Sequence, residues 1–131
     1  MYVKSIEYVS GTDGDASVTI SDGKYDIVCF CYECHYHISE IVESPLDCFD
    51  TSCVQIADNM EYAVQKKSMP YAYYIQGMLV NHRTGIVKMG KISFHINPKL
   101  ISKDISDRDF ICFITSRVDL RYREEVGCRR I

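Results

Sequence analysis

The sequence is poor in the features that mark several large classes of protein. Alanine, the strongest helix former, is scarce, whereas ten tyrosines and five phenylalanines accompany many valines and isoleucines. The longest apolar run, from Ile27 to Tyr32, is far too short to cross a bilayer. The chain does not open with a basic stretch followed by an apolar core, so we expect no secretory signal and a cytoplasmic location. These absences favour a mainly β, globular protein.

An excess of positive charge is also missing, because the formal net charge is −3 and the sequence pI is about 5.8. The protein is therefore not expected to coat nucleic acid by bulk charge, although a local basic patch is still possible. The sequence contains no P-loop, no dinucleotide-binding fingerprint, no G-x-S-x-G elbow and no H-E-x-x-H motif. Since the enzymes that carry such motifs are excluded, we expect a protein without catalytic activity.

Alternating apolar residues predict a series of strands within a single domain. With 131 residues and no repeat or linker, the chain is expected to form one domain over residues 1–120, followed by a charged C-terminal tail at 121–131. Period-two segments predict strands over residues 3–9, 16–20, 25–34, 53–56, 71–80, 86–96 and 110–120. The Asp-Gly step in "SDGK" predicts a tight hairpin turn over Ser21–Lys24.

The order of these elements predicts a small barrel. Asp58, with Glu61 three residues later, resembles a capping box and predicts one short helix over residues 59–66. Gly77 and Gly90 fall inside predicted strands, where glycine often marks the bends that curl a sheet. We therefore expect an OB-like antiparallel barrel of five to six strands with one short helix. An antiparallel β-sandwich is the alternative.

A family resemblance points to the same fold. The segments that carry it are "SDGKYDIVCF", "SPLDCF", "YAYYIQG", "IVKMGKISF", "DISDRDFICF" and "SRVDL". In this pattern of turns and strands, residues 2–120 resemble a family of small bacterial proteins that are regarded as OB-like barrels with no assigned activity. The resemblance implies a fold and no chemistry.

Cysteine and histidine are concentrated in "CFCYECHYH", residues 29–37. Zinc requires four converging ligands, and Cys31-x2-Cys34 has the spacing of one ligand pair. The candidate metal ligands are Cys31, Cys34, His35, His37, Cys48 and Cys53. The competing interpretation is that Cys29 and Cys31 are small buried residues on one face of a strand, and this interpretation is favoured. The count of seven cysteines is odd, so a complete disulfide framework within one chain is excluded.

Basic and aromatic residues gather between residues 66 and 91, a stretch without any acidic residue. The candidates for binding single-stranded nucleic acid or a protein partner are Lys66, Lys67, Tyr71, Tyr73, Tyr74, His82, Arg83, Lys88 and Lys91. The alternative is that the tyrosines pack against neighbouring strands and the lysines protect a sheet edge.

Three hypotheses about function follow from the sequence. The first is a non-catalytic binding module that uses the basic and aromatic stretch, with no cofactor. The second is a structural or assembly protein whose exposed aromatic residues form an interface in a homo-oligomer. The third is a small zinc-binding protein built on Cys31 and Cys34.

Overall fold

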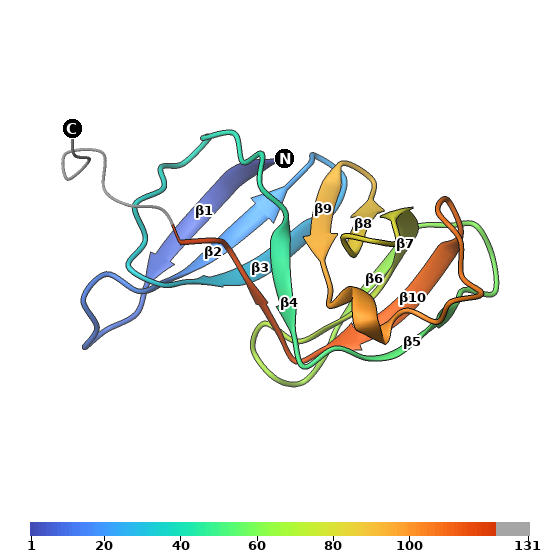
Figure 1. Ribbon diagram of the computed structural model, residues 1–131. Coiled ribbons are helices and arrows are strands. Elements are labelled where there is room, and N and C mark those ends of the chain that lie inside the picture. The colour runs from blue at the N-terminus through green and yellow to red at the C-terminus, as the bar shows by residue number, and fades with distance from the viewer. Residues whose placement is uncertain (123–131) are drawn as a thin grey trace, which may run out of the picture.

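The computed structural model describes residues 1–122 as one mixed β-sheet (Figure 1). Its strands are β1 (Tyr2–Tyr8), β2 (Ala16–Ser21), β3 (Asp26–Cys31), β4 (Leu46–Phe49), β5 (Ser52–Ile56), β6 (Ala63–Lys66), β7 (Tyr73–Asn81), β8 (Ile86–Met89), β9 (Ile92–His95), β10 (Phe110–Thr115) and β11 (Arg117–Asp119). The order across the sheet is β1-β2-β3-β11-β4-β9-β8-β7-β10-β5, and β6 pairs with β7. Within the described residues, no helix is long and apolar enough to cross a membrane.

The prediction of an OB-like barrel is wrong, and so is the alternative of a sandwich. β1 and β5 are the two ends of the strand order and do not pair with each other, so the sheet is open. The pairings β3–β11 and β4–β9 are parallel, whereas an antiparallel fold was expected. Figure 1 shows β1–β3 at one end of the molecule and β5, β7 and β10 at the other, with β4 between them.

Two expected strands are each divided into two shorter strands. Residues 110–120 form β10 and β11, and the Ser116 N–H between them donates to the Phe49 carbonyl. β10 joins β7 and β5, whereas β11 joins β3 and β4. Residues 86–96 turn at Gly90, whose φ of 63° lies in the left-handed region, and so form the hairpin β8–β9. The divided chain thus supplies more strands than the five or six expected.

The predicted short helix is also wrong. Residues 63–66 form β6, which pairs with Tyr73–Gln76 of β7, and residues 57–62 form a loop. The Glu61 N–H donates to the side chain of Asn59 instead of opening a helix. Backbone pairing with β7 therefore outweighs the local capping pattern. The helical structure of the described chain is a single 3-10 turn at Pro98–Leu100.

The hairpin at "SDGK" is confirmed. Asp22 Oδ1 accepts from the backbone N–H groups of Lys24 and Tyr25 at 2.9 and 2.8 Å. Gly23, between Asp22 and Lys24, has a φ of 95°, which glycine adopts without strain. β2 and β3 pair in unbroken register on either side of this turn.

One apolar cluster forms the core of the described residues. Its largest fully buried side chains include those of Phe94 on β9 and Phe113 on β10. Cys29, Cys31 and Cys34 belong to the same cluster, so the first part of "CFCYECHYH" is core, as the favoured interpretation predicted. Gly77 of β7 is packed so closely that a Cβ there would collide with the Lys88 carbonyl oxygen of β8. The charged tail predicted at 121–131 lies outside the described residues from residue 123 onward.

Candidate binding surface

The six candidate metal ligands are spread over the molecule. Cys31 ends β3 and is buried, as is Cys34, whereas His37 is exposed. Cys48 lies within β4, and Cys53 is exposed on β5 at the end of the sheet. His35, half-buried, completes the set. In residues 1–122, no group of three or more His, Cys, Asp or Glu side chains could hold a metal ion. The zinc hypothesis therefore gains no support from the geometry.

The thiols of Cys29 and Cys48 are also poor nucleophiles. Burial raises the pKa of the Cys29 thiol well above its ordinary value, and the neighbouring Cys48 raises it further. Burial likewise raises the pKa of Cys48. Because the thiolate is the reactive form, these two side chains are suited to packing and unsuited to attack.

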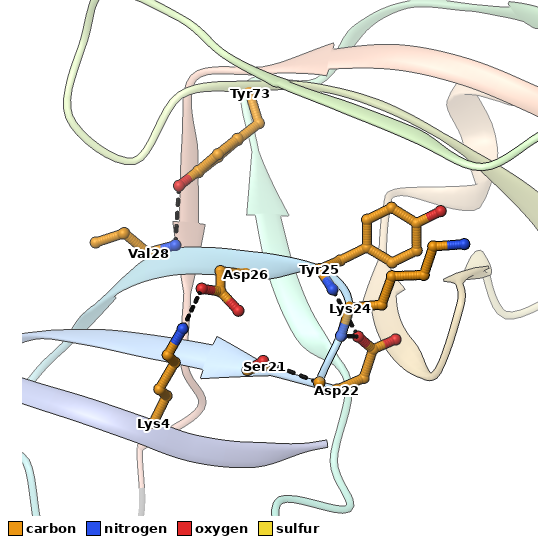
Figure 2. A network of polar contacts seen from close by, with 9 residues as sticks. Lys4, Ser21, Asp22, Lys24, Tyr25, Asp26, Val28 and Tyr73 are labelled. Carbon is orange, nitrogen blue, oxygen red and sulfur yellow. Dashed lines mark hydrogen bonds and ion pairs between the residues drawn. The ribbon is translucent and has the colours of Figure 1, made fainter.

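The three candidate tyrosines make internal contacts. The Tyr73 hydroxyl accepts a hydrogen bond from the Val28 backbone N–H at 2.9 Å, and Figure 2 shows the side chain reaching β3 from across the sheet. The Tyr71 hydroxyl shares a hydrogen bond of 2.5 Å with Ser17 Oγ, and its ring packs edge-on against Phe30. The Tyr74 hydroxyl donates to Gln76 Oε1 at 2.9 Å. Tyr71 and Tyr73 thus reach β2 and β3, Tyr74 bonds within its own strand, and the three are not arranged as an open platform for stacking bases.

The basic candidates occupy several different elements. Lys66 is exposed at the end of β6, Lys67 is half-buried after it, and Lys88 is exposed on β8. Lys91 lies in the β8–β9 turn, where its backbone N–H donates to Asp22 Oδ2 at 2.8 Å. The other two, His82 and Arg83, occupy the β7–β8 turn, and the His82 N–H donates to Asp107 Oδ1 at 2.7 Å. An acidic residue, Asp107, therefore lies within the basic stretch as it is folded.

Four apolar residues that the sequence did not single out lie at the β5 end of the sheet. We call them the apolar surface: Ile56, Met60, Tyr62 and Phe110. Ile56 ends β5, Met60 and Tyr62 lie in the loop between β5 and β6, and Phe110 begins β10. The exposed fractions are 51% for Ile56, 77% for Met60 and 38% for Tyr62. Side chains of this size and exposure, brought together from three segments, form a patch of the kind that contacts other molecules.

Hydrogen bonds with β7 and β10 fix the loop between β5 and β6, which carries Met60 and Tyr62. Gln76 of β7 is buried, and its Nε2 donates to Asn59 Oδ1 and to the Glu61 carbonyl, both at 2.8 Å. The Ala57 N–H donates to the Phe110 carbonyl at 2.9 Å, which extends the β5–β10 pairing into the loop. The apolar surface is thus held on ordered backbone although its side chains point outward.

The aromatic rings continue beyond this surface. The ring centroids of Tyr62 and Phe110 are 5.4 Å apart, and those of Tyr62 and Tyr25 are 6.5 Å apart. Contacts at these distances stabilise aromatic pairs. The ammonium group of Lys24 lies over the Tyr25 ring, with Nζ 5.4 Å from the ring centroid. The rings of Tyr25, Tyr62 and Phe110, which are far apart in the sequence, therefore form one row.

A hollow adjoins the apolar surface and is open to solvent. Its lining residues are Ile56, Ala57, Asp58, Asn59, Met60, Arg108, Asp109 and Phe110. Two of them carry carboxylates and one carries a guanidinium, and Glu61 follows Met60 in the same loop. The surroundings of the apolar surface are thus net acidic. No pattern in the sequence indicates this site, because its residues fall at the end of one predicted strand, in the predicted helix and at the start of another predicted strand.

No protein-family model matches this chain, and neither the curated proteins nor the solved structures include a detectable match. The resemblance to the small bacterial family therefore stays a prediction.

Proposed function

We propose that this protein is a binding module that contacts a protein partner through the apolar surface. The observation that carries the proposal is the joint exposure of Ile56, at the end of β5, and of Met60 and Tyr62, on the loop that Gln76 fixes beside a hollow. Burial of apolar side chains drives most protein association, and exposed aromatic and methionine side chains are favoured at such contacts. Contact with a partner would remove this apolar area from water.

The residues around the apolar surface favour a protein partner over single-stranded nucleic acid. Asp58 and Asp109 in the hollow would repel phosphate groups, and the tyrosines expected to stack on bases are engaged internally. Nucleic acid would be indicated instead by salt-sensitive binding of a single-stranded oligonucleotide that is lost in the variant K88E/K91E.

The test uses a display library of random peptides, selected on the native protein. We expect selected peptides to bind I56S/M60S at least about tenfold more weakly than the native protein, because residues central to a contact contribute most of its affinity. The matched control is I38S/M69S. Ile38 and Met69 are 62% and 66% exposed, comparable with Ile56 and Met60, but lie outside the apolar surface.

Two results would contradict the proposal. One is that no peptide is enriched on the native protein above background. The other is that the selected peptides bind native protein, I56S/M60S and I38S/M69S equally well. Thermal unfolding of each variant verifies that the substitutions leave the fold intact.

A further inference from the structure

The two ends of the sheet differ in how their outer edges are covered. At β1, the segment after β3 returns to cover the first residues: the Val3 N–H donates to the Glu40 carbonyl at 2.9 Å, and the Ser39 N–H donates to the Val3 carbonyl at 2.7 Å. β1 also carries the exposed charges of Lys4 and Glu7. Charges and a covering segment are the usual means by which proteins keep an edge strand from pairing with another chain.

β5, at the other end, has neither protection within residues 1–122. Among the strands of the described chain it pairs with β10 alone, so one edge of its backbone faces no strand. Its sequence, "SCVQI", contains no charged residue and no proline. The first part of the strand is distorted, since Cys53 has a φ of 56° and the register with β10 shifts between Cys112 and Ile114. The regular part of the open edge is therefore Val54–Ile56.

The open edge and the hollow are continuous. Ile56 is both the last residue of β5 and a lining residue of the hollow. A strand that added to Val54–Ile56 would therefore pass directly beside the hollow and could place one of its alternating side chains there.

From this continuity we infer that the partner supplies an extended segment that adds to β5 as a further strand, with an apolar side chain at the hollow and Lys or Arg residues beside it. The inference rests on the proposed function and specifies its partner. The charge follows from Asp58, Asp109 and Glu61, which outnumber Arg108 around the hollow. A second copy of this chain is disfavoured, because two such acidic surroundings would face each other across a two-fold axis.

The test uses synthetic peptides of about nine residues, a length that covers an ordinary strand. The parent peptide alternates Lys with Ile and Val, and a matched peptide has Glu in place of every Lys. Two further peptides carry the parent sequence with N-methyl groups on one or the other set of alternate residues. N-methylation removes amide donors from one edge of an extended peptide only. Binding is measured by fluorescence anisotropy.

The charge preference is tested by comparing the Lys and Glu peptides, and strand addition is tested by comparing the two N-methylated peptides. The Glu peptide is expected to bind about tenfold more weakly than the parent. One N-methylated peptide is expected to lose binding by a similar factor, while the other, whose methyl groups face solvent, binds like the parent. In the variant D58K/E61K the preference between the Lys and Glu peptides should reverse. The control D13K/E43K makes the same charge change at two exposed positions away from the hollow and should leave the preference unchanged.

Several outcomes would overturn the inference. Failure of the parent peptide to bind would do so, as would equal binding of the Lys and Glu peptides or of both N-methylated peptides. A dimer in sedimentation analysis that is lost in I56S/M60S would assign the edge to a second copy instead. The proposed function survives these failures if the library yields peptides of another kind that depend on Ile56 and Met60, and it falls with the inference if the library yields none.

Discussion

At the scale of single residues, the cysteines show how burial decides the role of a reactive side chain. Cys29 and Cys31 are two positions apart on β3, so both point into the core, where a thiol behaves as a small apolar group. Cys53 is instead exposed, on the open edge strand. One residue type therefore occupies opposite environments, and the two should differ in chemistry.

Alkylation with iodoacetamide should follow this difference. In native protein at about pH 8 we expect Cys53 to be modified first among the cysteines of residues 1–122, because its side chain is exposed. Cys29 should stay unmodified until the protein unfolds, since burial both shields it and raises its pKa. Peptide mapping by mass spectrometry measures each site over time, and urea-unfolded protein is the control. Modification of Cys29 at the rate of Cys53 in native protein would contradict the structure.

Residue types predicted the core better than the surface. The period of two in "VCFC" was enough to place Cys29 and Cys31 on one buried face. Nothing comparable marks Met60 as exposed, because a methionine in an irregular segment is equally compatible with the core. Its position depends on Gln76, which is distant in sequence and holds the loop through Asn59 and Glu61. Such a contact cannot be read from local pattern.

At the scale of elements, Asp22 joins two turns that are far apart in the chain. Its Oδ1 organises the β2–β3 turn, seen in Figure 2, and its Oδ2 accepts from the Lys91 N–H of the β8–β9 turn at 2.8 Å. Burial acts to raise the pKa of the Asp22 carboxyl. The hydrogen bonds from backbone N–H groups, that of Lys91 first, outweigh burial and leave this pKa below its usual value.

Removal of this carboxylate should weaken the fold in a pH-dependent way. We expect D22A to lower the free energy of unfolding by about 1.5–3 kcal/mol at neutral pH, the range for hydrogen bonds to charged groups. Because the folded-state pKa is lowered, the contribution is complete above the ordinary aspartate pKa and is lost as pH falls through the folded-state value. The difference between native protein and D22A should therefore shrink between about pH 7 and about pH 2.5.

Urea unfolding at several pH values measures this difference. Asp26, whose pKa is also lowered, chiefly by its hydrogen bond with Lys4, is present in both proteins. The charge of Asp22 acts to raise the Asp26 pKa, so the difference reports Asp22 together with its effect on Asp26. The control D13A removes an exposed carboxylate from the β1–β2 loop and should have little effect. A difference between native protein and D22A that stays constant over this pH range would show that the carboxylate charge does not stabilise the turns.

Short sequence patterns predicted the Asp-Gly turn correctly, but they failed where an element depends on a distant part of the chain. The Asp-Gly turn was predicted correctly because its conformation depends on the turn residues themselves. The helix over residues 59–66 was wrong because the backbone of β6 pairs with β7, a partner that the capping pattern does not include. The break at Ser116 likewise depends on the Phe49 carbonyl, which lies in another part of the chain.

At the scale of the whole molecule, strand order determines where the proposed binding surface lies. The same number of apolar segments could close a barrel, and a closed barrel would have no free edge. The parallel pairings of β11 with β3 and β4 with β9 instead leave β1 and β5 at opposite ends of an open sheet. Topology of this kind depends on contacts distant in sequence. It could not be predicted from periodicity, and neither could the site at the β5 end.

The most direct test of the account is a map of where a selected peptide binds. The backbone amide resonances of isotope-labelled protein are followed by NMR during titration with the strongest peptide from the library. We predict that the shifted amides lie in residues 52–62 and 108–110, which hold β5, the loop after it and the start of β10. Shifts confined to Lys66, Arg83, Lys88 and Lys91, with residues 52–62 unchanged, would contradict the account and return the function to the basic stretch.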